Sequence, residues 1–180
     1  MRVIRGRELR LLIREEEIRD RVRELGKAIS EDFRGSEGLV VVGLLKGAFV
    51  FVADLIREIE VPLGVDFLWV SSYGQSMESE GRLKVLKDLD SDIEGKDVLL
   101  VDDILDTGIT LAKVCDLLKG RKPSRLKTCV LLDKKGRRRV AFEPDYVGFE
   151  VPNLFLVGYG LDWGEAGRQL RSIYAVEELK

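Results

Sequence analysis

The chain has 180 residues, of which 30 are basic, 32 are acidic and none is histidine, and this composition excludes several kinds of protein. Its near-neutral charge gives no indication of a nucleic-acid partner bound through bulk electrostatics. Because histidine is missing, a Ser-His-Asp triad, a Cys-His pair and a histidine-ligated zinc site are excluded, so acid–base work falls to carboxylates, lysine or tyrosine. The length suits a single domain, residues 1–180, with a sizeable core.

The two cysteines and the apolar runs indicate where such a chain would reside. Cys115 and Cys129 lie in apolar surroundings without the spacing of a metal site, so we expect buried, reduced thiols. No apolar run approaches the roughly 20 residues that span a bilayer, and the first residues are too charged for a secretory signal. We therefore expect a cytoplasmic protein with no membrane partner.

The first part of the chain alternates between helix and strand patterns. Within residues 14–33, apolar side chains recur at spacings of three and four, which predicts an amphipathic helix with acidic residues at its start. Residues 38–47 (GLVVVGLLKG) form a continuous apolar run between glycines and predict a strand buried on both faces. Helical spacing returns over residues 48–59. Residues 61–74 then read as a further strand.

A polar stretch interrupts this alternation before it resumes. Residues 74–82 (GQSMESEGR) are polar and bounded by glycines, which favours a mobile loop, and residues 83–89 alternate like a returning strand. Next come a buried strand starting at about residue 98, a helix over residues 110–120, and three more predicted strands at residues 125–134, 145–151 and 154–160. This order is typical of a parallel α/β sheet, in which ligands bind at the carboxyl ends of the strands.

The stretch VLLVDDILDTGIT, residues 98–110, concentrates polar groups where a buried strand ends. A glycine and two threonines between strand and helix, within residues 106–110, would make a cradle for a phosphate group. The lysine and the longer glycine spacing of a nucleoside-triphosphatase loop are missing. Asp102 and Asp103 could accept hydrogen bonds from ribose hydroxyls or help to hold a hydrated Mg²⁺, or could simply solvate the end of the strand.

This stretch resembles the phosphoribosyl-pyrophosphate signature of the type I phosphoribosyltransferases. The segments VVGLLKGAFVFVADLIREI, SSYG, LLDK, DYVGFEVP and LFLVGYGLDWGEAGR follow in the family's order and are similar to its hypoxanthine-guanine branch. The resemblance covers nearly the whole chain. It implies an α/β fold with a mostly parallel central sheet flanked by helices, a mobile loop at about residues 74–83, and a small hood built from the N-terminal strand and the C-terminal segment.

The resemblance also implies an activity. Members of the family move a 5-phosphoribosyl group from phosphoribosyl pyrophosphate to N9 of hypoxanthine or guanine, with Mg²⁺, and yield IMP or GMP and pyrophosphate. They usually form homodimers or homotetramers. Two alternatives stay open: a relative that prefers xanthine, and a non-catalytic regulator that binds RNA on the same fold. The near-neutral charge and the presence of Lys134, Phe155 and Asp162 weigh against the regulator.

By the same resemblance, residues 106–110 hold the 5′-phosphate, and Asp102 and Asp103 lie beside the ribose hydroxyls. Many members have glutamate where this chain has Asp102. Asp106 is the catalytic residue, because its match in the family lies near N7 of the purine and handles a proton during transfer. The matches of Asp162, Asp102 and Asp103 are the expected metal ligands.

Other segments match the remaining parts of the family's site. Residues 45–47 match the pyrophosphate loop, in which the family has a cis peptide bond between the counterparts of Leu45 and Lys46. Lys134 matches the lysine that donates to O6 of the purine, and the rest of KKGRRR is expected to be a solvated turn. The expected substrate-binding residues are Leu45, Lys46, Gly47, Ser72, Tyr73, Asp102, Asp103, Ile104, Leu105, Asp106, Thr107, Gly108, Ile109, Thr110, Lys134, Phe155, Leu156, Asp162 and Arg168.

Within that set, Phe155 would stack on the base, Leu156 would offer main-chain contacts, and Arg168 would contact pyrophosphate. Ser72 and Tyr73 begin the polar loop, which in the family folds over the site and excludes water.

Overall fold

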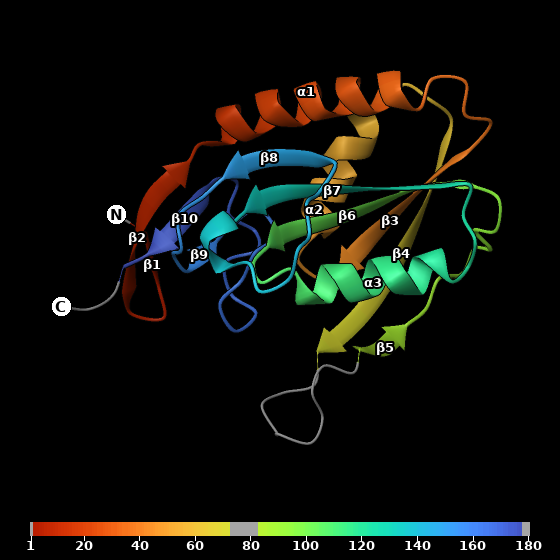
Figure 1. The fold of residues 1–180 in the computed structure, drawn as a ribbon. Coiled ribbons are helices and arrows are strands. Elements are labelled where there is room, and N and C mark those ends of the chain that lie inside the picture. Colours follow the sequence, from red (N-terminus) through yellow and green to blue (C-terminus); the bar gives the residue numbers. More distant parts are fainter. Residues whose placement is uncertain (1, 73–82, 178–180) are drawn as a thin grey trace.

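The computed structural model describes residues 2–72 and 83–177, and two sheets organise this part of the chain (Figure 1). The larger sheet has six strands in the order β5-β4-β3-β6-β7-β8, and a four-stranded sheet in the order β1-β2-β10-β9 lies at one end of the molecule. The strands are β1 Arg2–Ile4, β2 Arg7–Ile13, β3 Leu39–Leu45, β4 Leu63–Ser72, β5 Leu83–Lys87, β6 Asp97–Leu105, β7 Arg125–Asp133, β8 Tyr146–Glu150, β9 Leu156–Val157 and β10 Ile173–Val176. The α-helices are α1 Glu15–Asp32, α2 Phe49–Leu55 and α3 Ile109–Lys119, and two short 3-10 helices span Ile56–Glu58 and Lys135–Arg137.

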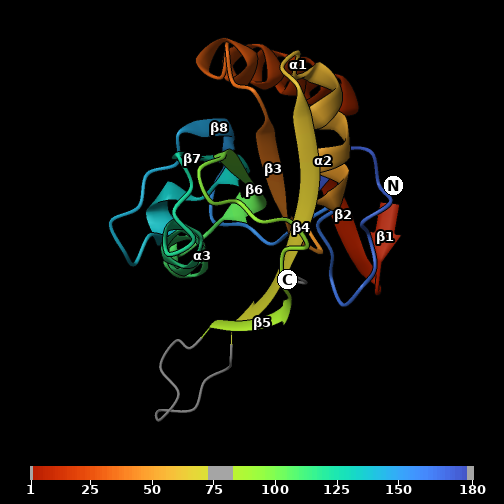
Figure 2. The same ribbon diagram turned by 90° about the vertical axis from the view of Figure 1, so that its right-hand side faces the viewer.

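The larger sheet is parallel from β4 to β8, and only its edge strand β5 runs antiparallel. The continuous apolar run of β3 is buried along almost its whole length, as expected for a strand covered on both faces. Successive side chains of β3 enter different cores: Leu39 and Val41 pack under α1 and α2, whereas Val40 and Val42 pack under α3. Figure 2 shows the helices on the two sides of the sheet.

The helices form where the sequence periodicity predicts them. In α1 the stripe that begins at Ile18 is buried, and three glutamates occupy the first turn, where they complement the helix dipole. The predicted helix over residues 48–59 is α-helical only to Leu55 and then tightens into a 3-10 turn. Helix α3 ends before Gly120, as expected. None of the helices in the described part of the chain is long and apolar enough to cross a membrane.

The smaller sheet is the expected hood, and it joins the two ends of the described chain. Strand β10 pairs antiparallel with β2, so residues near the C-terminus lie directly beside residues near the N-terminus. The prediction of a main-sheet strand over residues 154–160 was wrong. Only Leu156–Val157 is a strand, and it belongs to the hood, because Gly158, Tyr159 and Gly160 all have positive φ and turn the chain away.

The cysteine prediction is confirmed. Cys115 and Cys129 are buried free thiols that lie in the cores on opposite faces of the larger sheet. Burial raises the pKa of Cys115 to about 11, so this side chain behaves as a small apolar group and not as a reactive thiolate.

Candidate active site

Three neighbouring strands end side by side at one edge of the larger sheet. Strand β6 is hydrogen-bonded between β3 and β7, with Gly43 opposite Val101 and Leu105 opposite Asp133. The segments that follow these strands therefore meet at the same edge: residues 45–47, 106–110 and 134. These are the three strand ends at which the sequence predicts a ligand site.

The turn between β6 and α3 has the features of an anion site. Gly108 precedes the helix with a φ of 81°, a conformation that glycine adopts without strain, and the amide of Ile109 donates to Oγ1 of Thr107 at 3.4 Å. The first amides of a helix lack partners within the helix, and α3 has no acidic residue in its first turn. The turn therefore offers amide donors suited to an anion, at the residues for which the sequence predicts a phosphate site.

Asp102 and Asp103 lie next to each other near the end of β6, and both are partly buried. Burial raises the pKa of Asp102 well above its usual value, and the charge of Asp103 adds to this effect. Burial also raises the pKa of Asp103, although hydrogen bonds and the charge of Arg168 oppose the shift. Hydroxyl donors or a cation placed here would relieve the repulsion between the two carboxylates.

The loop after β3 packs directly against this pair. The peptide bond between Leu45 and Lys46 is cis, as the family resemblance implies. A Cβ atom added to Gly47 would lie only 1.8 Å from Oδ2 of Asp103, so glycine is what allows the loop to approach the carboxylate. Nζ of Lys46 reaches across to Oε1 of Glu165 at 3.1 Å, and this bond lowers the pKa of Glu165.

The segment from Gly158 to Arg168 closes over the loop. A Cβ atom added to Gly160 would lie 2.2 Å from the carbonyl oxygen of Gly47. Arg168 fixes the segment, because Nη1 donates to the Gly160 carbonyl at 2.8 Å and Nη2 pairs with Oδ1 of Asp162 at 2.7 Å. Nε of Arg168 is buried without a hydrogen-bond partner among the described residues. Asp162 also accepts a hydrogen bond from the amide of Glu165 at 2.7 Å.

Lys134 and Phe155, which are expected to recognise a base, show the opposite of the burial that is usual for lysine and phenylalanine. Lys134 is only 9% exposed, and burial lowers the pKa of its ammonium group. Phe155 is 51% exposed, and its ring meets Trp163 edge-on with the centroids 6.0 Å apart. Core packing is therefore excluded as the role of Phe155, and its neighbour Leu156 is buried in β9. A buried lysine that has no ion-pair partner among the described residues, and an aromatic ring that is half exposed, both favour ligand contact over packing as their roles.

Two arginine side chains that the sequence did not predict as site residues lie at this edge of the sheet. Oδ1 of Asp106 accepts a hydrogen bond from Nε of Arg137 at 2.8 Å, on the surface of the protein. The expectation of a solvated turn after Lys134 was wrong for Arg138, whose side chain is 14% exposed and paired with Asp133. The run of three arginines was the available signal, but nothing in their order distinguishes the buried one.

Two of the expected loop residues lie at or beyond the limit of the described structure. Ser72 is the last residue of β4. Tyr73 lies outside the described residues, as does nearly all of the expected mobile loop at residues 74–83, of which only Leu83 is described, at the start of β5.

The expected magnesium ligands do not form one cluster. In residues 2–72 and 83–177, no group of three or more Asp, Glu or Cys side chains is arranged to hold a metal ion. Asp162 is paired with Arg168, whereas Asp102 and Asp103 are adjacent and repel each other. Mg²⁺ is usually held by one or two carboxylates together with water and substrate phosphates, so the aspartate pair fits this mode of binding.

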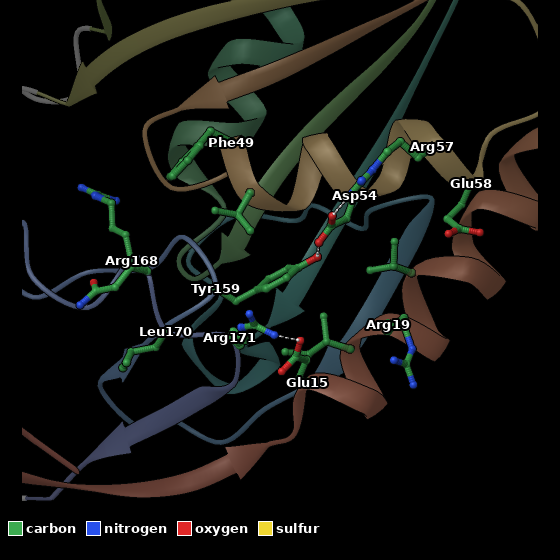
Figure 3. Close-up of a pocket in the computed structure, with 14 residues that line it drawn as sticks. Glu15, Arg19, Phe49, Asp54, Arg57, Glu58, Tyr159, Arg168, Leu170 and Arg171 are labelled. Carbon is green, nitrogen blue, oxygen red and sulfur yellow. Dashed lines mark hydrogen bonds and ion pairs between the residues drawn. The ribbon is translucent and has the colours of Figure 1, made fainter.

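A cavity of about 830 Å³ lies between α1, α2 and the segment that begins at Tyr159 (Figure 3). Tyr159 donates from its hydroxyl to Oδ2 of Asp54 at 2.6 Å, and Arg171 pairs with Glu15 at 3.2 Å. Of the expected site residues, Arg168 is the one that lines this cavity in the described structure. The cavity therefore shares one residue with the expected site and is not the strand-end site itself.

Comparison with known proteins places this geometry in a family. Residues 13–163 match the phosphoribosyl transferase domain family. The chain is 59% identical over 178 residues to the hypoxanthine-guanine phosphoribosyltransferase of Aquifex aeolicus, covering 99% of this chain and 100% of that protein. It is 48% identical over 161 residues to the hypoxanthine phosphoribosyltransferase of Escherichia coli, covering 89% of this chain and 90% of that protein.

A solved structure agrees with the sequence relatives. The crystal structure of a hypoxanthine-guanine phosphoribosyltransferase from Bacillus anthracis matches this fold with a TM-score of 0.90 and 47% identity, over 94% of this chain and 100% of that chain. Sequence identity and similarity of fold therefore agree over nearly the whole chain. The chain therefore belongs to the phosphoribosyltransferase family, in its hypoxanthine-guanine branch.

Proposed function

We propose that this protein is a purine-salvage transferase that moves the 5-phosphoribosyl group of phosphoribosyl pyrophosphate to N9 of hypoxanthine or guanine, giving IMP or GMP and pyrophosphate. The names of its relatives support this activity. The observation that carries it is the meeting of three strand ends at one edge, where the turn before α3 follows two adjacent carboxylates and a glycine loop packs against them.

The chemistry explains why these groups are needed together. Breaking the anomeric C–O bond develops positive charge on the sugar and negative charge on the departing pyrophosphate. The carboxylates of Asp102 and Asp103 are suited to hold the ribose hydroxyls, and their negative charge favours the cationic sugar. Arg168, with a buried N–H that has no partner among the described residues, is suited to donate to the leaving group. Mg²⁺, when bound, would neutralise charge on pyrophosphate.

Asp106 is suited to accept a proton at the purine. Its carboxylate lies at the start of the phosphate-binding turn and is paired with the exposed side chain of Arg137. Because this ion pair is on the surface, it costs little to exchange it for a contact with a bound base. In a chain without histidine, a carboxylate placed in this way is a suitable general base.

Lys134 is suited to select the base. An ammonium group donates to the O6 carbonyl of a 6-oxopurine but is poorly matched to the amino group of adenine. The partly desolvated surroundings of Lys134 strengthen such a hydrogen bond. Phe155 is exposed and can stack on the purine ring, and Leu156 can offer main-chain contacts to its edge.

The location, the domain organisation and the assembly state of the protein are further parts of this proposal. The buried free thiols support a reducing, cytoplasmic location. We also propose that residues 1–180 form one domain, with the polar loop as a lid, and that the protein is a homodimer or homotetramer. Light scattering would measure the assembly state.

The test is an assay of pyrophosphate release from phosphoribosyl pyrophosphate with hypoxanthine, guanine, xanthine or adenine, with and without Mg²⁺. We expect turnover with hypoxanthine and guanine that depends on Mg²⁺. A higher kcat/KM for xanthine would identify a xanthine-preferring enzyme. Absence of turnover with every purine, together with tight RNA binding, would refute the proposed function.

A further inference from the structure

Arg138 is the point at which several segments of the site are tied together. Its Nη2 donates to Oδ1 of Asp133 at 2.5 Å, and its Nη1 donates to the carbonyl oxygens of Asp106 at 2.9 Å and Leu105 at 3.3 Å. Its Nε donates to the carbonyl oxygen of Phe142 at 3.2 Å. One guanidinium therefore joins the end of β7, the end of β6 and the segment that leads into β8.

The carbonyl groups that Arg138 holds belong to the backbone of the proposed site. Leu105 is the last residue of β6, and its carbonyl oxygen also accepts the amide of Lys134 at 2.9 Å. The next residue, Asp106, carries the proposed catalytic carboxylate. Arg138 and the Lys134 amide thus fix the same turn from the side of β7, so the base-binding lysine and the phosphate-binding turn share one anchor.

Burial makes this anchor well defined. Asp133 is fully buried, and its second oxygen, Oδ2, has no hydrogen-bond partner among the described residues, so Arg138 is the cation that compensates its charge. The aliphatic stem of Arg138 also passes close to the start of α3, because a Cβ atom added to Gly108 would lie 3.1 Å from its Cδ. The planar guanidinium can make these bonds together, which the single ammonium of lysine cannot.

We infer that Arg138 is a positioning residue that holds the base-binding lysine and the phosphate-binding turn at a fixed separation, with Asp133 setting the orientation of its guanidinium. The inference rests on the proposed function of this site. Arg138 is not proposed to contact substrate. Because transfer requires the sugar and the base to be aligned, a small displacement of either half-site lowers the rate of the chemical step.

The first experiment compares Arg138→Gln and Arg138→Lys with Arg139→Gln as the matched control. Arg139 is the next residue, is exposed, and carries the same charge. We expect Arg138→Gln to lower kcat about 100-fold and to raise KM for both hypoxanthine and phosphoribosyl pyrophosphate, as ~1 Å misplacement does in other enzymes. Arg138→Lys should restore part of the loss, and Arg139→Gln should stay within about twofold of the parent in kcat and both KM values. Equal kinetic constants for Arg138→Gln and Arg139→Gln would overturn the inference.

A second variant separates positioning from stability. Arg138→Gln leaves the buried Asp133 carboxylate without a cation and can prevent folding, whereas the double variant Asp133→Asn with Arg138→Gln removes that charge as well. We expect the double variant to regain the melting temperature but not kcat. Recovery of both quantities would show that Arg138 has only a structural role.

A readout without turnover distinguishes failure of this inference from failure of the proposed function. If the parent protein does not release pyrophosphate with any purine, the proposed function fails. Amide hydrogen exchange of residues 105–109 then still tests the anchor, and we expect faster exchange in the double variant than in the parent protein. Unchanged exchange in this turn would overturn the inference independently of activity.

Discussion

Replacing Gly47 with alanine should disable the site while leaving the fold in place. The added Cβ atom would lie 1.8 Å from Oδ2 and 2.5 Å from Cγ of Asp103. The shorter separation falls about 1.6 Å short of ordinary contact at 3.4 Å, so the carboxylate or the loop must move by roughly that amount. The substitution therefore displaces a side chain proposed to hold the sugar.

The magnitude follows from this displacement. A misplacement of about 1 Å in an enzyme site can cost about 100-fold in rate, which corresponds to about 2.7 kcal/mol in the barrier. Overpacking costs about 1–3 kcal/mol of stability, and the lower end applies here because Asp103 is partly exposed and can rotate. In a chain of this length, about 1 kcal/mol lowers the melting temperature by about 2–4 °C.

The assay is kcat/KM for pyrophosphate release at 25 °C, together with a thermal melt. Gly38→Ala is the matched control, because a Cβ atom at Gly38 has no neighbour within 4 Å, and we expect wild-type activity from it. If displacement of Asp103 is the cause, Gly47→Ala combined with Asp103→Ala should lose little more than Asp103→Ala alone. Activity of Gly47→Ala within threefold of the wild type would refute the reasoning.

Three further predictions concern acid–base chemistry and selectivity. Asp106→Asn should lower kcat at least about 100-fold with an unchanged melting curve, since it removes the proposed general base, and near-normal turnover would exclude that role. Lys134→Met should raise KM for hypoxanthine at least about 10-fold and reduce discrimination against adenine, whereas the exposed Lys135→Met should not; an unchanged ratio of kcat/KM values would contradict the assignment. Asp102→Asn should raise the melting temperature at pH 7, measured without Mg²⁺, by about 2–4 °C, or about 1 kcal/mol. The pKa of Asp102 is raised in the folded state, so its carboxyl group stabilises the protein at low pH and loses that effect as pH rises through the folded pKa. The advantage of asparagine should therefore shrink as pH falls, and an advantage independent of pH would contradict this cause.

The sequence by itself predicted most of what local pattern controls. The spacing of apolar residues predicted α1, because a buried stripe at helical spacing needs no knowledge of its partner. The glycine-bounded apolar run predicted β3, and the strand-end position of Asp102, Asp103 and Asp106 predicted one site at one edge, because parallel neighbours end together. The resemblance to the family supplied the hood and the expected roles of individual residues.

Tertiary structure decided the features that depend on contacts between distant parts of the chain. Strand β10 pairs with β2 across almost the whole sequence. The positive φ angles of Gly158, Tyr159 and Gly160 end the strand that the apolar run at residues 154–160 predicts. Arg137 and Arg138 are neighbours of the same type, yet one pairs with Asp106 at the surface and the other with the buried Asp133. The sequence pattern does not distinguish these two residues. The folded backbone directs one arginine to the surface and the other into the protein, and only the second can anchor the site.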